Sequence, residues 1–379
     1  SVMGSSTFHA TGTLFDGGSD DIASFALGET HGCAILSSAI RCWGSGSNGS
    51  LGSIAPLNTL SLDPVAVQTV STTGWTPLEV SVSKSSGPGG GSSCAVFEED
   101  STGIKRIACW GFGTSGQIGS YGSTSTSRPD TVNSPVYWES GQGAVGSPAD
   151  SDSLASSPYD VAEVSIDPSG SFGCARSNQG HVKCWGYNDK GQLGHGNIST
   201  ASDGVNEMGS NLAFVPLGSN RSATQISVGA QHACALLDNN SVKCWGSNSY
   251  GVTGQETSTG SIGDEEGEMG DNLPTIDLGS GRTATQISSG SYHTCALLDD
   301  SSVKCWGRNS NGQLGIGNSS DIGDGANEMG DHMSSVDLGT GRTAISIISG
   351  GYHSCAILDS GVLKCWGKNS NGQLGQGHS

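Results

Sequence analysis

Cysteine, histidine and tryptophan recur at fixed spacing along this chain, a combination that could bind a metal or carry out redox chemistry. All twelve cysteines fall into six pairs, and Trp-Gly follows the second cysteine of each pair. The pairs are Cys33 and Cys42, Cys94 and Cys109, Cys174 and Cys184, Cys234 and Cys244, Cys295 and Cys305, and Cys355 and Cys365. No Cys-x-x-Cys occurs, and a spacing near ten residues does not resemble that of zinc ligands. The pattern therefore favours structural disulfide bonds and predicts no metal site at the cysteines.

Each pair reads as the two arms of a β-hairpin. In an antiparallel register Cys295 faces Cys305 and Leu297 faces Val303, so these four side chains share one face. Directly opposed residues lie close enough for a disulfide bond. Six such bonds imply an oxidising compartment, and we expect an extracellular or cell-surface protein. Six pairs of buried, reduced thiols are the alternative.

The hairpin belongs to a repeat of about sixty residues. The tryptophans of the Cys-Trp-Gly motifs are separated by 67, 75, 60, 61 and 60 residues, and each unit contains about four short strands and no helical periodicity. These features predict an all-β fold, a single β-propeller over 1–379, with an open solenoid as the alternative. The expected repeats are 1–52, 53–119, 120–194, 195–254, 255–315 and 316–379. An N-terminal strand over 7–14 would complete the last blade.

Two motifs in the repeat resemble functional sites. Histidine stands two residues before the first cysteine in four units, but Ser92 and Phe172 replace it in the others. We therefore predict a role in packing between blades or in hydrogen bonding to the backbone. Gly44 to Gly49 and Gly111 to Gly116 match the dinucleotide-binding Gly-x-Gly-x-x-Gly, yet no helix follows. The third position is Asn or Gly in all six copies. We interpret this as a turn that needs a left-handed backbone.

These residues together resemble the regulator of chromosome condensation 1 (RCC1) repeat family. The repeat reads Ile287, Gly290, His293, Ala296-Leu297, Val303 and Trp306-Gly307, followed by Asn309 and Gly312-Gln-Leu-Gly315. The resemblance covers essentially the whole chain and implies a β-propeller of four-stranded blades. The cysteine pairs are an addition that is typical of secreted variants. Nucleotide exchange and chromatin binding are not expected, because the chain is acidic and has no basic tail.

Composition narrows the classes of partner. The net charge is −19, which argues against nucleic acid, and no apolar run is long enough to span a bilayer. We therefore expect no nucleic-acid partner and no membrane insertion. Five sequons are consistent with a secreted glycoprotein, and their asparagines are Asn48, Asn197, Asn220, Asn239 and Asn318.

Functional hypotheses concern the segments in which the copies differ. Equivalent acidic insertions lie in units four to six, and Asp264, Glu265, Glu268 and Asp271 are weak candidates for binding calcium. The favoured interpretation is that Glu and Met in these insertions pack onto a neighbouring blade. A long loop over 121–159 carries Tyr137 and Trp138, which are candidates for partner binding.

Three function classes follow. We expect a non-catalytic recognition or adhesion propeller that binds an extracellular protein or a glycan. The alternative is a structural subunit of a surface layer, filament or appendage that binds copies of itself. An enzyme is the least favoured class, since no nucleophile elbow or His-Glu-x-x-His motif occurs. We expect no cofactor, and calcium is the one weak candidate.

The disulfide prediction is tested by intact mass. Reduction of the purified protein should add twelve hydrogens, because each of six disulfide bonds takes up two. Labelling with an alkylating reagent before reduction should leave the mass unchanged. Twelve alkylated thiols in the unreduced protein would contradict both the disulfides and the oxidising compartment.

Overall fold

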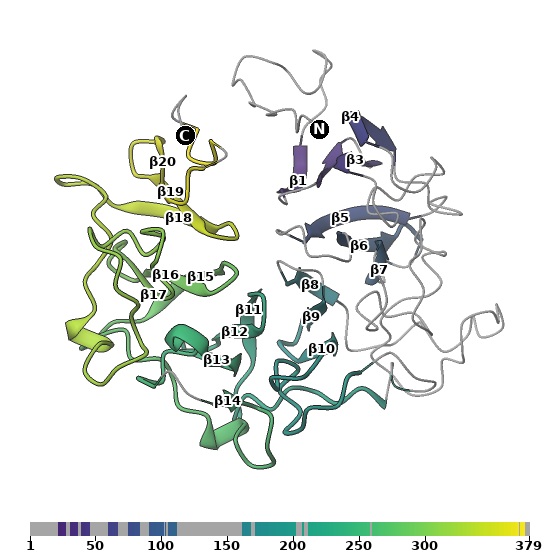
Figure 1. The fold of residues 1–379 in the computed structure, drawn as a ribbon. Coiled ribbons are helices and arrows are strands. Elements are labelled where there is room, and N and C mark those ends of the chain that lie inside the picture. Colours follow the sequence, from purple (N-terminus) through teal and green to yellow (C-terminus); the bar gives the residue numbers. More distant parts are fainter. Residues whose placement is uncertain are drawn as a thin grey trace.

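The fold is seen in a computed structural model, which describes 22–27, 31–36, 39–45, 60–66, 75–83, 91–101, 103, 105–111, 161–167, 171–201, 207, 211–257, 260–370 and 372–375. Within these residues the chain forms six antiparallel sheets in sequence order. Figure 1 shows the sheets arranged around a common centre, with the N- and C-terminal sheets on either side of one opening. The predicted all-β propeller of six repeats is confirmed. The predicted N-terminal strand over 7–14 lies outside the described residues.

The strands follow the same order in every sheet. The first two sheets contain β1 (Ile22–Leu27), β2 (His31–Leu36), β3 (Ala39–Ser45) and β4 (Leu60–Ala66), then β5 (Trp75–Val82), β6 (Ser92–Glu99) and β7 (Lys105–Gly111). The next two contain β8 (Val161–Ile166), β9 (Phe172–Ser177) and β10 (Val182–Gly186), then β11 (Ala223–Val228), β12 (His232–Leu237), β13 (Val242–Ser247) and β14 (Ser261–Ile262). The last two contain β15 (Ala284–Ser289), β16 (His293–Leu298) and β17 (Val303–Gly307), then β18 (Ala344–Ser349), β19 (His353–Leu358) and β20 (Leu363–Gly367).

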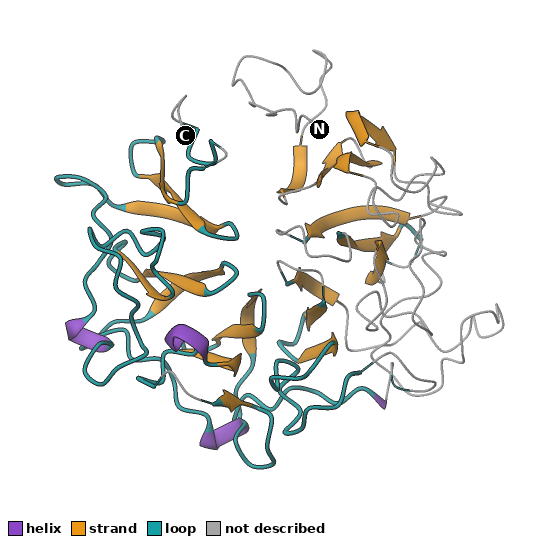
Figure 2. Cartoon of the chain, viewed as in Figure 1, coloured by secondary structure: helices purple, strands orange, loops and turns teal. Residues whose placement is uncertain are grey.

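The expected fourth strand varies in length among the described residues, from seven residues in β4 to two in β14 or a single bridge. Only the first and fourth of the described sheets contain it, as β4 and β14. In the third and fifth sheets it is one pair of residues, Gly186 with Ala201 and Gly307 with Ile322. The helical residues that Figure 2 colours purple include three single 3-10 turns, η4 (Ser249–Gly251), η5 (Gly270–Asn272) and η6 (Gly330–His332). No helix in the described part of the chain has the length and hydropathy needed to cross a membrane.

The second and third strands of each sheet form the cysteine hairpin in the predicted register. Cys295 faces Cys305, Leu297 faces Val303, and Ala296 faces Lys304. All six predicted disulfides are present, one per sheet, with Cα–Cα distances between 4.0 and 4.1 Å. The hairpin therefore has one face that carries the disulfide and another that carries the tryptophan.

Consecutive sheets bury these two faces against each other. Cys295, Leu297, Val303 and Cys305 of the fifth sheet pack with Ala344, Ile347 and Leu358 of the sixth, and each earlier junction has a similar apolar cluster. The indole N–H groups of Trp245, Trp306 and Trp366 donate to main-chain carbonyls of the preceding repeat at 2.9–3.0 Å. Among the described residues no cluster joins the sixth sheet to the first. The disulfide face of the sixth sheet is more open, with Ile348 57% and Leu363 61% exposed.

The repeated histidines connect neighbouring sheets, as their equivalent placement predicted. Nε2 of His31, His232 and His293 lies 2.8–2.9 Å from the hydroxyl of Ser93, Thr294 and Ser354 in the next sheet. Gly290 makes room for the ring, since a Cβ there would lie 2.1 Å from Cε1 of His293. Phe172 takes the histidine position in the third sheet, and Ala233 takes the hydroxyl position opposite it; both are buried in one cluster. A polar pair is thus replaced by an apolar pair.

The asparagine that recurs in the Gly-x-Asn turns of this chain has a different role from the one predicted. Asn248 has a φ of −101°, so it does not need a left-handed backbone. Asn188 and Asn309 are fully buried, and their Oδ1 atoms accept hydrogen bonds from the N–H groups of Leu193 and Leu314. The asparagine is therefore kept for its side chain, which closes the turn by satisfying a buried main-chain donor.

A second set of side-chain links joins the first strands of neighbouring sheets. Oε1 of Gln225 accepts from the N–H of Ile287 at 2.9 Å, and its Nε2 donates to the carbonyl of the same residue at 3.0 Å. Glu79 occupies the equivalent position in the second sheet, and its carboxylate accepts from the N–H of Val164. Burial, reinforced by the nearby charge of Glu163, raises the pKa of Glu79 to about 8. Below that pH a neutral carboxyl group can imitate glutamine.

Substitution of Glu79 tests this link. A carboxyl whose pKa is higher in the folded protein than in the unfolded chain stabilises the fold at low pH, and that contribution is lost as the pH rises through the folded value. The free energy of unfolding of E79Q should therefore exceed that of the natural protein by roughly 1–3 kcal/mol at pH 9 and by less at pH 5. Denaturant titrations at both pH values measure this. The exposed Glu266→Gln is the control, and equal pH profiles for E79Q and the natural protein would refute the link.

Candidate functional site

Three variable positions lie beside the invariant residues of each repeat, on the turns that join its strands. One precedes the histidine, one follows Trp-Gly, and one lies two residues after the turn asparagine. Main-chain hydrogen bonds place the first two side by side: the N–H of Arg308 donates to the carbonyl of Tyr292 at 2.7 Å, and that of Lys368 donates to the carbonyl of Tyr352 at 2.9 Å. The framework therefore fixes where these side chains emerge and leaves their chemistry free.

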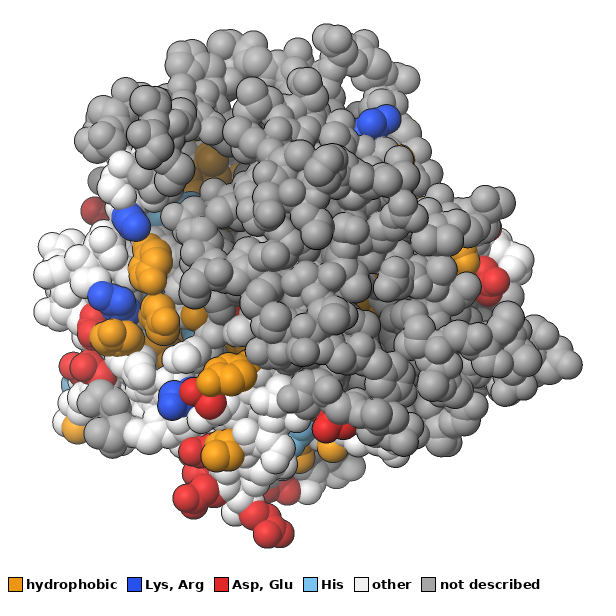
Figure 3. Space-filling view, turned by 45° about the vertical axis from the view of Figure 1, so that its right-hand side comes forward, with side chains coloured by type: hydrophobic (Ala, Val, Ile, Leu, Met, Phe, Trp, Pro, Cys, Tyr) orange, Lys and Arg blue, Asp and Glu red, His pale blue; other side chains and the backbone are white. Residues whose placement is uncertain are grey.

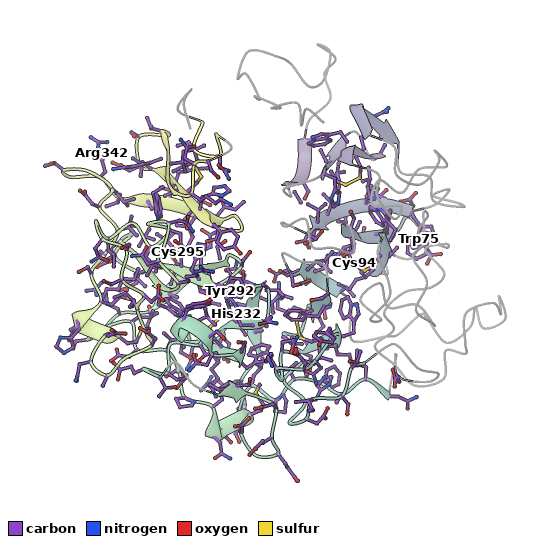
Figure 4. All side chains as sticks on the ribbon, in the orientation of Figure 1. Trp75, Cys94, His232, Tyr292, Cys295 and Arg342 are labelled. Carbon is purple, nitrogen blue, oxygen red and sulfur yellow. A yellow bond between two sulfur atoms is a disulfide. The ribbon has the colours of Figure 1, made fainter. Side chains whose placement is uncertain are left out.

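In the last three repeats five of these nine positions hold Tyr250, Tyr292, Arg308, Tyr352 and Lys368, which we name the tyrosine–cation face. The rings of Tyr250 and Tyr292 have centroids 5.8 Å apart, and those of Tyr292 and Tyr352 lie 6.3 Å apart. Figure 3 shows hydrophobic side chains, a class that includes tyrosine, interspersed with Lys and Arg on the described part of one face. Figure 4 places Tyr292 near the centre of the ring.

Cations sit over the tyrosine rings. The guanidinium carbon of Arg308 lies 4.8 Å from the ring centroid of Tyr250 and 6.0 Å from that of Tyr352. Nζ of Lys368 lies 5.3 Å from the centroid of Tyr352. Such contacts hold a cation above the ring face by electrostatic attraction to the π system. The result is a surface in which aromatic area and positive charge are held together.

The tyrosines are not merely solvated side chains. Burial, followed by the proximity of Tyr352 and Tyr250, raises the pKa of Tyr292 above its ordinary value. Tyr250 is 37% exposed and has a φ of +63°, a left-handed conformation that a bulky residue rarely adopts. Strain of this kind is characteristic of residues kept for function. A tyrosine at this position costs stability that a glycine or asparagine would not.

The tyrosine–cation face continues toward the third repeat with a different charge pattern. Tyr187 is 37% exposed, and the charge of the adjacent Asp189 raises its pKa. Asp189 also forms an ion pair with Lys190 at 3.4 Å. In this repeat the cation therefore has an acidic partner, whereas no ion pair involves Arg308 or Lys368 in the part of the chain that the structure describes.

Other basic residues belong to the framework. Nζ of Lys304 is buried and donates to the carbonyls of Leu278 and Gly330 at 3.0 and 2.8 Å, which ties the acidic insertion to the hairpin. Nζ of Lys243 does the same to the carbonyl of Gly270. Met269 and Met329 are buried at the junctions between sheets. These contacts agree with the interpretation that the insertions pack onto neighbouring blades.

Two of the four carboxylates that were weak calcium candidates, those of Glu268 and Asp271, accept main-chain hydrogen bonds. Oε2 of Glu268 accepts from the N–H groups of Gly263 and Glu265 at 2.7 and 3.1 Å. Oδ1 of Asp271 accepts from the N–H of Ser219 at 2.7 Å. Within the described ranges no group of three His, Cys, Asp or Glu residues is arranged to hold a metal ion. The carboxylates of these loops thus shape the insertions.

Some predicted site residues cannot be placed. Tyr137, Trp138 and Asn48 lie outside the described residues, so the loop over 121–159 stays a prediction. The other four sequon asparagines, Asn197, Asn220, Asn239 and Asn318, are exposed. Sequence reasoning missed the tyrosine–cation face because it compared the repeats at their invariant positions. Aligning the residues that flank Gly-x-x-His and Trp-Gly-x-Asn would have shown tyrosine beside arginine or lysine in the later copies.

Comparison with known proteins identifies the repeat. The model of the "Regulator of chromosome condensation (RCC1) repeat" matches 164–192, 223–252, 284–313 and 344–373, and a second model of that description matches 179–236. The human WBSCR16 structure superposes with a TM-score of 0.65 at 16% identity, covering 95% of this chain and 80% of that one. Prp20p from Saccharomyces cerevisiae gives 0.64 at 20% identity, covering 94% and 74%. The chain therefore carries RCC1 repeats and has the fold of an RCC1-type propeller.

Relatives found by sequence are much longer proteins. The E3 ubiquitin-protein ligase HERC2 of Mus musculus is 25% identical over 273 residues, which are 72% of this chain and 5% of that protein. The ultraviolet-B receptor UVR8 of Arabidopsis thaliana is 29% identical over 198 residues, which are 52% and 39% of the two chains. This chain thus matches less than half of the length of each of these relatives.

A matched pair of variants separates the tyrosine–cation face from the framework. Arg308→Met should change the free energy of unfolding by at most about 1 kcal/mol, because it removes partly exposed cation–π contacts. Lys304→Met should cost about 2–3 kcal/mol, because two buried carbonyls lose their charged donor. Denaturant unfolding of both variants measures the difference. An equal or larger loss for R308M would assign Arg308 to the framework.

Proposed function

We propose that the chain is a non-catalytic recognition propeller that binds a partner protein through the tyrosine–cation face, in an extracellular or other oxidising setting. The observation that carries the proposal is the packing of three tyrosines and two cations at positions where the repeats differ. Tyrosine and arginine are the residue types that contribute most to binding energy at protein interfaces. A rigid scaffold that presents them on turns is a common design for recognition.

The setting of the proposal rests on the disulfides. Every cysteine of the chain takes part in one of six disulfide bonds. Such bonds persist where thiols are not continually reduced. The exposed sequon asparagines are compatible with the same setting.

A protein partner is favoured by the behaviour of proteins with this fold. Prp20p, the yeast RCC1, shares the fold at 18–20% identity; one of its structures is described with its binding properties to Gsp1p and histones, and another as a complex with Kap60. Those partners are not transferred, because the likeness is one of fold. What transfers is the expectation that an RCC1-type propeller works by contacting another macromolecule.

The test is selection of ligands on the folded protein. A displayed peptide library and a glycan array should be screened against the natural protein, Y292A and the double variant Y250A/Y292A. We expect a peptide or protein ligand whose affinity falls at least tenfold in the double variant, as two interface aromatics are removed. Phe214→Ala is the control, since Phe214 has the same 37% exposure as Tyr250 but lies elsewhere.

Two results would contradict the proposal. Ligands that bind all variants equally would place recognition on another surface. Self-association with no ligand that depends on the tyrosines would favour the alternative of a structural subunit. The exposed apolar residues of the sixth sheet, Ile348, Ile357 and Leu363, are the observation that supports this alternative.

A further inference from the structure

We propose that the tyrosine–cation face recognises an acidic segment of its partner, with Arg308 as the anchor for a carboxylate and Lys368 as a second cationic contact. This inference rests on the proposed function and specifies the chemistry of the partner. It starts from an imbalance between acidic and basic residues. The chain contains 35 Asp and Glu residues against 16 Lys and Arg residues, yet two neighbouring cations on one face have no acidic partner among the described residues.

Four other arginines are arranged differently. Arg221, Arg282 and Arg342 occupy one equivalent position in three repeats, and each forms an ion pair with an aspartate 17 residues later at 3.1–3.2 Å. Arg176 pairs with Glu163 at 2.9 Å. In these four cases an acidic residue balances the charge of the arginine. Arg308 is held by aromatic rings, which fix its position without neutralising its charge.

The orientation of Arg308 leaves its outer nitrogens for a ligand. Its Nε donates to Oγ of Ser310 at 3.0 Å, and its guanidinium lies against the ring of Tyr250. Neither of its two Nη groups donates a hydrogen bond to a described residue. These two nitrogens form the end of the planar fork, which can donate two parallel hydrogen bonds to one carboxylate. Pre-orientation by Ser310 and Tyr250 lowers the entropy lost when that carboxylate binds.

Lys368 extends the site to a second negative charge. Its Nζ and the guanidinium of Arg308 both lie within about 6 Å of the Tyr352 ring, at 5.3 and 6.0 Å. At 0.15 M salt charges farther apart than about 8 Å are largely screened. The net charge of −19 therefore opposes an acidic partner only weakly at contact range, while the two local cations still attract it.

The arrangement of the rings favours a peptide over an acidic polysaccharide. The planes of Tyr250 and Tyr292 meet at 73°, and those of Tyr292 and Tyr352 meet at 39°. The three rings therefore do not form one flat platform on which successive sugar rings could stack. They form separate small surfaces, which suit the side chains that lie between the acidic residues of a peptide.

Binding of model polyanions tests the proposal. Poly-L-glutamate, poly-L-glutamine and polygalacturonate should be titrated into the intact protein at 0.15 M salt by calorimetry. We expect poly-L-glutamate to bind and poly-L-glutamine not to bind. The double variant R308M/K368M should lose at least about tenfold in affinity, since a charged hydrogen bond contributes about 1.5–3 kcal/mol. Replacing Arg308 by lysine (R308K) in place of methionine should retain only part of the affinity for poly-L-glutamate, because lysine lacks the planar fork.

The control is Arg342→Met, which removes a paired arginine elsewhere and should leave poly-L-glutamate binding within twofold. Absence of poly-L-glutamate binding, or binding that R308M/K368M does not weaken, would overturn the inference. Binding of polygalacturonate in place of poly-L-glutamate would assign the face to an acidic glycan and overturn it as well.

The peptides selected under the proposed function separate the two claims. Peptides that depend on Tyr250 and Tyr292 and are enriched in Asp and Glu support both. Peptides that depend on the tyrosines but lack acidic residues leave the proposed function standing and refute the acidic partner. Peptides that depend on neither tyrosine refute the proposed function itself.

Discussion

Every sheet of this propeller has two apolar faces, and this constraint governs the rest of the structure. Because the disulfide face and the tryptophan face are both buried in a typical blade, no blade can exclude water from both faces alone. The neighbouring blade supplies the missing surface, and the indole N–H reaches back to a carbonyl of the preceding repeat. The hairpin disulfide holds the two strands in the register that places Leu and Val on the buried face. Stability is therefore a property of junctions between repeats as well as of the repeats themselves.

At these junctions a polar side chain of one sheet faces a complementary group in the next sheet. Histidine faces a hydroxyl at three junctions, while Phe172 faces Ala233 at a fourth. Glutamine holds the next strand in the fourth and fifth sheets, and Glu79 and Glu163 take its place in the second and third. Arg176 compensates the charge of Glu163. Both members of such a pair differ from one junction to another. The reason is that a buried polar group without a partner lowers the stability of the fold more than an apolar pair of similar shape does.

These demands account for most of the invariant residues and leave the turns free to vary. Tyr250, Tyr292, Arg308, Tyr352 and Lys368 lie beside framework residues whose main chain sets their spacing. RCC1-type blades thus provide a rigid base, and the chemistry of recognition depends on what the variable positions carry. Here they carry aromatic rings and two cations that have no ion-pair partner among the described residues, on an otherwise acidic molecule. The strained backbone of Tyr250 is consistent with selection for contact over stability.

The sequence alone determined the features that depend on short-range geometry. The register of Cys295 with Cys305, the six disulfides and the propeller class follow from alternation along two adjacent strands and from the number of copies. Other features needed the tertiary structure. From the sequence, the turn asparagine was expected to tolerate a left-handed backbone. The structure shows instead that the buried side chain of Asn309 accepts a hydrogen bond from the N–H of Leu314. The contact between Tyr250 and Arg308 joins residues 58 positions apart in different repeats. Their proximity is created by the angle between adjacent blades, which the packing of the two apolar faces decides and no local pattern encodes.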